Sequence, residues 1–469
     1  MISGNSASIA KTGSGSLVLS GANTFTDGLS LQEGTLFLGS SSTVNGDNHV
    51  QTGPVGTGSL TMNGGTTLAP TGDNRTLANP ITLNGGTAHF GGANLLTLTG
   101  IISGTGILDV IGSISLENQN TYVGATMVTS GTLGLRATNA LPTSTAVTVS
   151  SGATLEVDEY NVMIGSLAGA GDVTLEAPEE GSLTFSVGND GTSTTFSGVI
   201  SGGSSVRNTV EKIGSGTLTF SGANTYEAGT TVSAGRLIAA NNSAFGRGTL
   251  TVSGGSLIVN SGITLTNGFA TVANGGTLGG VGTFSPAGGV TIGSSGAAAT
   301  VAPGTAPSTS RHTVGTLTFT TGLTLASGGT WLWNLQSPGG TAGSGWDLLS
   351  IAGNLNLTAT DENPFKLKLI SVAVDGDFGF GSQTDGFNPA TTYQWTIATA
   401  SGAITGFSDD VFVFDTSLFA NSLAGGNFSI SQSGNNLMLN FTPVPEPSTY
   451  ALMGLGLTAV FLRLRRRRA

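Results

Sequence analysis

The stretch "GSGTLTFSGANTYEAGTTVSAGRLI", from Gly214 to Ile238, decides the fold. Apolar and polar residues alternate along it in short runs, which glycine, serine and asparagine interrupt. Such alternation, with β-branched side chains, predicts short β-strands that bury one face. The glycines and asparagines between the runs provide turns with positive φ angles.

The same unit occurs twice more, from Gly13 to Leu38 and from Gly112 to Leu135. At its centre lies an Asn-Thr-aromatic anchor, and eleven residues after each asparagine there is a glycine. The anchor asparagines are Asn23, Asn120 and Asn224, and the glycines are Gly34, Gly131 and Gly235. An Ile-Ser-Gly triplet precedes each anchor, beginning at Ile2, Ile102 and Ile200. The fixed spacing predicts one structural unit used three times.

Short strands on a repeating path can form a sandwich, a propeller or a solenoid. We predict a right-handed parallel β-helix, because its coils need short strands, small residues at tight bends and stacks of like side chains. A coil of roughly 20–25 residues would rise by one strand spacing of ~4.8 Å. We expect each anchor asparagine to bond a neighbouring backbone group. Lys11 and Lys212 occupy the same repeat position, which also indicates a structural role.

The composition changes near residue 337, so we divide the chain into four parts. We expect a β-strand-repeat solenoid at 1–337, a linker at 338–346, a C-terminal β-structured cap or small sandwich at 347–443, and a sorting signal at 444–469. The cap is expected because a solenoid needs its last coil covered.

The three units resemble the autotransporter-associated β-strand repeat, a family of bacterial surface passengers with β-helical folds. The resemblance covers roughly residues 1–335 and is strongest at the three anchors. It implies export and an extended scaffold, but no particular chemistry.

Charge and composition exclude several classes of function. The chain has no cysteine, which excludes a disulfide framework, a thiolate metal site and a cysteine nucleophile. Five of the 15 basic residues lie in the last seven positions, so residues 1–462 carry 10 basic against 26 acidic side chains, a charge of −16. A body this acidic repels nucleic acid, and we expect no nucleic-acid partner.

The chain ends with "VPEPSTYALMGLGLTAVFLRLRRRRA", Val444 to Ala469. Tyr450 to Leu462 carries no charge, and as a helix it would span ~20 Å, short of the hydrocarbon core of roughly 30 Å. Flanking arginines that snorkel would let this single short transmembrane helix cross a thin region. Its membrane-facing residues would be Tyr450, Leu452, Leu455, Leu457, Val460, Phe461 and Leu462. The basic anchor on the cytoplasmic side would be Arg463, Arg465, Arg466, Arg467 and Arg468.

The order of these parts resembles a PEP-CTERM sorting signal, with Val444, Pro445, Glu446 and Pro447 as its processing motif. The resemblance implies handling by an exosortase, a membrane-embedded transpeptidase related to cysteine proteases. A membrane-anchored precursor would then become a protein of the cell surface or extracellular matrix. Such a tail also implies a secretory signal peptide, which the sequence from Met1 to Gly13 does not show. We therefore expect further repeats and a signal peptide to be encoded upstream.

Few residues indicate chemistry, and we predict no catalytic site, no metal site and no cofactor. The acidic clusters are Glu156, Asp158 and Glu159, and Glu176, Glu179 and Glu180. They lie about one coil apart, so they would form a solvated face or, alternatively, a stripe that binds Ca²⁺. The segment Asp375 to Gly386 has some calcium-loop spacing but lacks a closing glutamate. His49, His89 and His312 have no partner at metal-ligand spacing. Trp331, Trp333 and Leu335 share one strand face, which indicates a buried stripe rather than a sugar platform.

These observations favour an exported structural protein of the cell envelope whose polar faces contact exopolysaccharide. The alternatives are a carbohydrate-active β-helical enzyme, similar to a polysaccharide lyase, and an adhesin. An enzyme should show a cleft with clustered carboxylates and basic groups on neighbouring coils. A scaffold should show uniform stacks of Asn, Thr and apolar residues.

Overall fold

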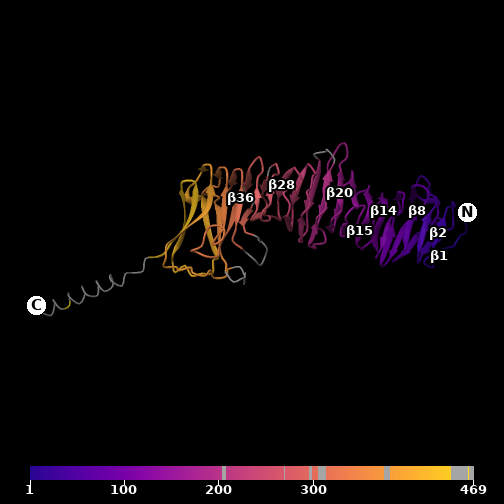
Figure 1. Ribbon diagram of the computed structural model, residues 1–469, viewed down its shortest axis with the longest axis horizontal. Helices are drawn as coiled ribbons and strands as arrows, with labels where there is room; N and C mark the ends of the chain where they lie inside the picture. The colour runs from indigo at the N-terminus through magenta and orange to yellow at the C-terminus, as the bar shows by residue number, and fades with distance from the viewer. Residues whose placement is uncertain are drawn as a thin grey trace.

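The computed structural model describes residues 1–202, 207–268, 270–294, 298–304, 313–373, 381–444 and Arg463. These residues form an elongated all-β body that runs from the N-terminal strands at one end to the C-terminal strands at the other (Figure 1). Within this part of the chain there are 46 strands and one 3-10 helix, Asp409–Val411. None of the described residues forms a helix long and apolar enough to cross a membrane.

The strands lie in four large sheets and one hairpin. The first sheet contains β1 (Ile9–Lys11), β3 (Leu29–Leu31), β7 (Leu60–Asn63), β10 (Ile81–Asn84) and β13 (Ile102–Gly104). The second contains β18 (Val162–Ile164), β21 (Leu183–Val187), β24 (Asn208–Lys212), β26 (Gly229–Val232), β28 (Thr249–Val252), β31 (Ala270–Val272), β34 (Val290–Ile292), β37 (Leu323–Leu325), β40 (Leu355–Leu357) and β43 (Ile404–Thr405). The third contains β30 (Thr264–Leu265), β33 (Thr283–Phe284), β36 (Thr316–Phe319), β39 (Leu348–Ile351), β42 (Tyr393–Ala400), β46 (Asn436–Thr442) and β45 (Asn427–Ser433). The hairpin pairs β5 (Thr43–Val44) with β6 (Val50–Thr52).

The fourth sheet has 22 strands and extends along the whole body. It contains β2 (Ser16–Leu19), β4 (Thr35–Leu38), β8 (Thr67–Pro70), β9 (Arg75–Leu77), β11 (Thr87–Phe90), β12 (Leu96–Leu98), β14 (Ile107–Leu116), β15 (Thr126–Leu135), β16 (Ala146–Val149), β17 (Thr154–Asp158), β19 (Ser166–Gly169), β20 (Asp172–Glu176), β22 (Thr194–Phe196), β23 (Ile200–Gly202), β25 (Thr217–Phe220), β27 (Arg236–Ala239), β29 (Ser256–Val259), β32 (Gly276–Gly280), β35 (Ala299–Pro303), β38 (Gly329–Leu335), β41 (Phe365–Ser371) and β44 (Phe412–Leu418).

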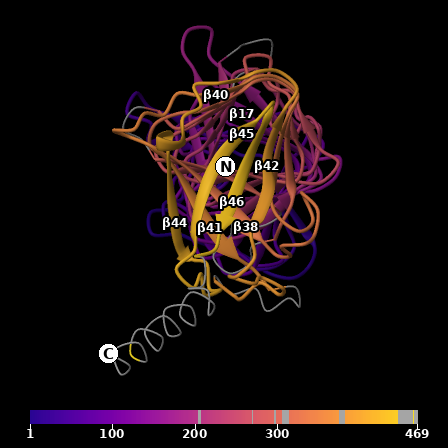
Figure 2. The ribbon, with the colours of Figure 1, turned by 90° about the vertical axis from the view of Figure 1, so that its left-hand side faces the viewer.

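Nearly all of this pairing is parallel, and each strand pairs with a strand one coil further along the chain. Thr209 of β24 lies opposite Gly229 of β26, which lies opposite Thr249 of β28, a step of 20 residues each time. This is the arrangement of a parallel β-helix or solenoid, and the view along the body shows its coils lying one behind another (Figure 2). The all-β class is confirmed, and these coils have the predicted length. The handedness stays a prediction.

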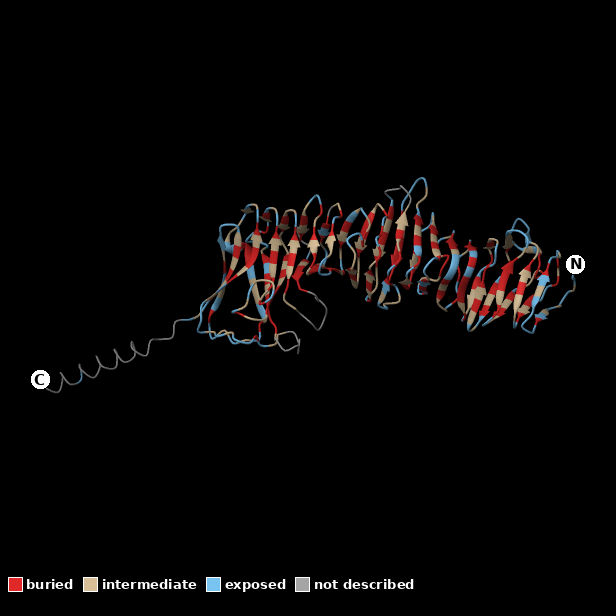
Figure 3. Cartoon of the chain, in the orientation of Figure 1, coloured by how far each residue is buried: buried red, intermediate tan, exposed pale blue. Residues whose placement is uncertain are grey.

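Alternation within each strand separates the core from the surface, as Figure 3 shows along the body. In the second sheet, the inward positions form a buried stack of aliphatic side chains: Val232, Val252, Val272, Ile292, Leu325 and Leu357. The neighbouring outward positions form a ladder of Thr231, Thr251, Thr271, Thr291, Thr324, Asn356 and Thr405. At its end, Thr405 Oγ1 donates to Asn356 Oδ1 at 2.9 Å. Successive coils thus repeat the same types of residue at the same positions.

Parallel pairing continues across the domain boundary predicted at 337. β39 pairs with β36, and β42 pairs with β39, so coils continue through the predicted cap. The predicted linker lies between β38 and β39, where the indole of Trp395 donates to Pro338 O at 3.0 Å. These coils are longer: Leu317 pairs with Leu349, and Leu349 pairs with Ala398. Parallel pairing requires only that the strand of each coil lie in register with the strand of the coil before it. The additional residues of a longer coil therefore form loops between strands. β42, β46 and β45 then pair antiparallel.

The anchor glycines have a steric reason. Gly34, Gly131 and Gly235 have φ angles of +74°, +75° and +61°. A Cβ added to Gly235 would lie 2.3 Å from Gly214 O on the neighbouring coil. A Cβ added to Gly34 would lie equally close to Gly15 O, and one added to Gly131 equally close to Gly112 O. Both the backbone conformation and the close approach of coils therefore require glycine.

We predict that Gly235→Ala lowers the free energy of unfolding by about 1–3 kcal/mol or more, because an alanine there adds backbone strain and a steric clash. Thermal unfolding followed by circular dichroism measures the change. Gly46→Ala is the matched control, since Gly46 lies in the β5–β6 hairpin, where an added Cβ would meet no atom within 4 Å. Equal effects of the two substitutions would contradict this explanation.

Candidate functional site

The buried anchor asparagines join coils through both ends of their carboxamides. Asn224 Oδ1 accepts the N–H of Ile200 at 2.7 Å, and its Nδ2 donates to Ala244 O at 2.6 Å. These two partners belong to the coils before and after the asparagine. The equivalent pairs are Ile102 N and Ala140 O for Asn120, and Ile2 N and Pro54 O for Asn23. The expected bond to a neighbouring backbone group is therefore present at all three anchors, and it places the Ile-Ser-Gly triplet on the coil next to each anchor.

The aromatic residue of each anchor is fully buried and has a matching partner four residues later. Tyr226 Oη lies 2.6 Å from Thr230 Oγ1, which donates to Phe245 O at 3.1 Å. Tyr122 makes the same contact with Thr126, at 2.5 Å. In the first unit the pair is Phe25 and Leu29, so both hydroxyls are replaced together. Burial raises the pKa of both tyrosines above the usual range.

The repeat lysines are held by backbone carbonyls. Lys212 Nζ donates to the carbonyl oxygens of Ile213, Gly214 and Ala234 at 2.6, 3.0 and 3.4 Å. Burial lowers the pKa of Lys212 to about 8, and the charge of Asp190 opposes this change. Lys11 makes the equivalent bonds to Thr12, Gly13 and Glu33. The ammonium groups thus join two turns of neighbouring coils, in agreement with a structural role.

His89 belongs to a polar row that the sequence did not reveal. Its Nδ1 lies 2.7 Å from Asp109 Oδ2, and Thr129 Oγ1 donates to Asp109 Oδ1 at 2.6 Å. The three residues stand on successive coils, about 20 residues apart, which is the one signal that could have found them. Because the carboxylate lies between the imidazole and the hydroxyl, the imidazole does not activate Thr129 as a nucleophile. The row therefore works as a clamp between coils.

The predicted acidic stripe is only partly assembled. Asp158 and Glu176 are in register on β17 and β20, but Arg136 forms ion pairs with Asp158 and with Glu156, the latter at 3.1 Å. Glu179 and Glu180 are exposed and lie away from this pair of strands. In the described ranges, no three His, Asp or Glu side chains are grouped closely enough to hold a metal ion. Sequence reasoning missed Arg136, which lies about one coil before Glu156.

Trp331, Trp333 and Leu335 are fully buried, which confirms the predicted core stripe. Trp333 Nε1 donates to Asp347 O at 2.9 Å, and its ring packs against that of Trp395. Asp347 is also fully buried; its carboxylate accepts the backbone N–H groups of Gly315 and Asn334. Burial raises the pKa of Asp347 well above its usual range, although these hydrogen bonds oppose the change. This network ties the last coils together.

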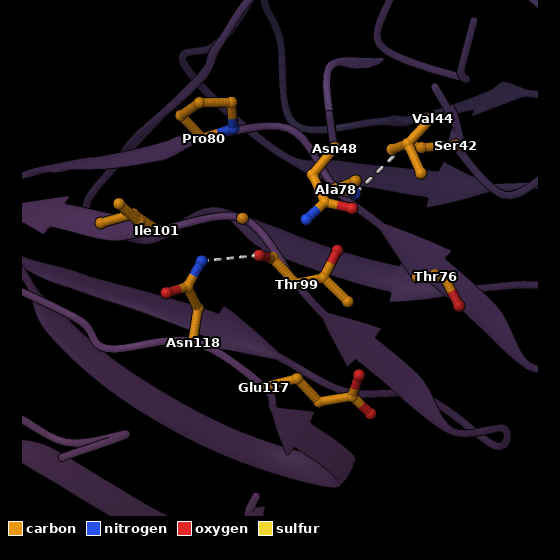
Figure 4. A pocket seen from close by; sticks show the side chains of 11 residues that line it. Ser42, Val44, Asn48, Thr76, Ala78, Pro80, Thr99, Ile101, Glu117 and Asn118 are labelled. Atoms are coloured by element: carbon orange, nitrogen blue, oxygen red, sulfur yellow. Dashed lines mark hydrogen bonds between the residues drawn. The ribbon is translucent and has the colours of Figure 1, made fainter. Parts of the chain in front are cut away.

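A wide hollow lies beside the β5–β6 hairpin (Figure 4). It is an open groove of about 560 Å³. Its lining consists of Ser42, Val44, Asn48, Thr76, Ala78, Pro80, Thr99, Gly100, Ile101, Glu117 and Asn118. A second hollow of about 230 Å³ is lined by residues that include Gln119, which follows Asn118 of the first hollow in the chain. Sequence reasoning predicted neither hollow, because the walls of each come from separate coils.

The sorting signal falls almost entirely outside the described residues. Val444 is described and 53% exposed, and Arg463 is exposed. Pro445 to Leu462 and Leu464 to Ala469 lie outside the described part, as do His312 and the first half of the segment Asp375 to Gly386. The predicted processing motif, transmembrane helix and arginine cluster therefore stay predictions.

Fold and anchors together define a repeat-built parallel β-solenoid. Residues 9–37, 111–135 and 210–239 match the passenger-associated-transport-repeat, and residues 443–467 match the PEP-CTERM protein-sorting motif. The chain thus carries three such repeats, each around one anchor, and a C-terminal PEP-CTERM motif, which confirms both resemblances. It is also similar to the adhesin BmaC autotransporter of Brucella suis biovar 1 (strain 1330), with 34% identity over 187 residues. That match covers 38% of this chain and 5% of the relative. Together these findings indicate a secreted or cell-envelope surface protein.

We predict that Asn224→Ala lowers the free energy of unfolding by about 2–4 kcal/mol, because it leaves Ile200 N–H and Ala244 C=O buried without their partner. Hydrogen exchange should quicken most at the Ile200 amide. Asn435→Ala is the control, since Asn435 is exposed and makes no side-chain hydrogen bond among the described residues; its effect should stay within about 0.5 kcal/mol. Unchanged exchange at Ile200 would rule out the bridge.

We also predict that Tyr226→Phe and Thr230→Leu each destabilise the protein, whereas the double variant recovers much of the loss. The double variant recreates the Phe25–Leu29 pair, and Phe245 O keeps a second donor in Asn267 Nδ2. A double-mutant cycle of unfolding free energies measures the coupling. Simple additivity of the two losses would contradict the pairing.

The pH dependence of stability in the same variants tests whether the hydroxyl of Tyr226 is buried. The unfolded chain ionises its tyrosines near pH 10, whereas burial keeps Tyr226 protonated in the folded protein because it raises the pKa of that residue. The folded state then binds more protons, so stability falls as the pH rises above about 10. This fall should be smaller in the double variant than in the natural protein.

Proposed function

We propose that this protein is an exported structural component of a bacterial cell surface or extracellular matrix. The observation that carries the proposal is the PEP-CTERM motif at residues 443–467, placed at the end of a long repeat-built body. In this proposal the body is a right-handed β-helix that acts as a scaffold and has no catalytic function.

Sorting would proceed through an exosortase. Pro445 and Pro447 would keep Glu446 in an extended segment that a processing enzyme can hold. The apolar run from Tyr450 to Leu462 would hold the precursor in the membrane, with the arginine cluster on the cytoplasmic side. Processing would then transfer the body to the surface or the matrix.

The outer face of the body suits contact with exopolysaccharide. The Thr231-to-Thr405 ladder presents hydroxyl and amide groups on successive coils, and it carries no charge. Such a surface can exchange hydrogen bonds with sugar hydroxyls without placing a charged side chain against the polymer.

An adhesin is the second candidate, and the similarity to the adhesin BmaC autotransporter favours it. Loss of cell-to-surface attachment in a deletion strain with a normal matrix would favour the adhesin. A changed matrix with normal attachment would favour the scaffold. Release of unsaturated sugars from polysaccharide by the purified protein would instead favour the third alternative, a polysaccharide lyase.

We predict that, in cells with the exosortase, the mature protein lacks the residues after the processing motif, because the motif directs cleavage there. Intact-mass analysis of native protein from strains with and without the exosortase measures this. Without the enzyme, the arginine cluster should remain on the chain. If the full tail remains in both strains, the body is permanently anchored and the sorting proposal fails.

A further inference from the structure

We propose that the groove beside the β5–β6 hairpin binds an uncharged glycan. The inference deepens the proposed surface function, because it gives the body a specific ligand in addition to general polar contact. This inference rests on the proposed export only in one respect: export determines where the protein would encounter the glycan.

The groove exists because one coil carries an insertion. Leu29 pairs with Leu60, a step of 31 residues, whereas Leu60 pairs with Ile81, a step of 21. The extra residues form the β5–β6 hairpin, and Ser42 fixes its base: Ser42 N donates to Thr76 O at 2.9 Å, and Ser42 Oγ accepts the N–H of Ala78 at 3.2 Å. The hairpin therefore stands as a wall over the following coils.

Polar groups without internal partners face this groove. The side chains of Asn48, Thr76 and Thr99 line it, and within the described structure none of them makes a side-chain hydrogen bond. Asn48 comes from the hairpin, and the threonines come from two coils beneath it (Figure 4). Three accessible amide or hydroxyl groups that are not engaged within the protein surround one hollow, and they are suited to a ligand rich in hydroxyls.

Apolar contacts complete the match. Val44 on the hairpin and Ile101 on the coil beneath are each 45% exposed, although both are aliphatic. A pyranose ring presents hydroxyls at its edge and C–H groups on its faces, so it can use both kinds of contact. Aromatic and arginine anchors, which dominate protein interfaces, are absent from the described residues that line this groove. The lining therefore lacks the usual anchors of a protein interface, and the glycan is assigned from the combination of polar groups with two exposed aliphatic side chains.

Charge narrows the class of glycan. Among the described lining residues, Glu117 is the one ionisable side chain, and no basic group accompanies it. A uronate, sulfate or phosphate group would meet an unbalanced negative charge in a body that is itself strongly acidic. This charge argues against anionic sugars, and the other lining residues, which carry no charge, suit an uncharged one.

The test uses the purified full chain on an array of uncharged, cationic and anionic glycans, with affinities for the bound glycans measured by calorimetry. We expect binding to uncharged glycans. Thr99→Val and Asn48→Gly should each weaken it about fivefold or more, because each removes one hydrogen-bonding group. Glycine suits position 48, where φ is +62°. Thr416→Val is the control and should change nothing, because Thr416 is exposed on β44, outside both this groove and the outward ladder. Thermal unfolding verifies that all variants fold.

A charge reversal gives an independent readout. Glu117→Lys should allow binding of an anionic polymer such as alginate, which the natural protein should not bind. The proposal is overturned if no uncharged glycan on the array binds, if anionic glycans alone bind, or if the groove variants bind as the natural protein does. Because purified protein is used, failure here leaves tail processing unaffected, and failure of tail processing leaves this result standing.

Discussion

A buried carboxamide that bonds the coil before it and the coil after it is the interaction on which the solenoid depends. Between strands, the chain bends and its N–H and C=O groups leave the sheet ladders, yet many of them remain buried. Leaving such groups unpaired is costly. Asn224 satisfies one donor and one acceptor at once, and they belong to different coils. Other buried asparagines do part of the same work: Asn79, Asn208 and Asn267 each donate to carbonyl oxygens of another coil.

Around these bridges, the remaining constraints follow. Glycine is required wherever a turn lies so close to the backbone of the neighbouring coil that a Cβ atom would clash with it, as at Gly235. Lysine stabilises places where carbonyl oxygens of two turns point toward the same position, because its ammonium group can donate to several of them, as at Lys212. The strands between the turns need only alternate inward aliphatic and outward polar residues. This explains why the three repeat units agree at a few positions and differ freely elsewhere.

Sequence reasoning predicted what depends on spacing within a coil. It found the anchors, the short strands, the length of the regular coils and the buried tryptophans. It did not find contacts between coils, because the step from one coil to the next varies along the chain. His89 lies opposite Asp109, and Arg136 follows Leu135, which lies opposite Val157, between Glu156 and Asp158. Neither contact is evident without the register. The groove was hidden for the same reason, since an insertion at 43–52 places a wall over residues that are distant in sequence. The parallel pairing that continues beyond residue 337 was also unforeseen, because long loops there hide the repeat.

The bridges between coils also affect how such a chain can change in length. Each coil presents to the next the same ladder of donors and acceptors, so removal of one whole coil leaves two edges that still fit. Removal of only a few residues instead shifts the strands of that coil out of register, so its hydrogen bonds to the neighbouring coils are lost. Length therefore changes most readily in steps of about 4.8 Å. Recombination between the similar repeat units of a gene would remove or add coils in whole numbers, and would thereby set the length of the rod.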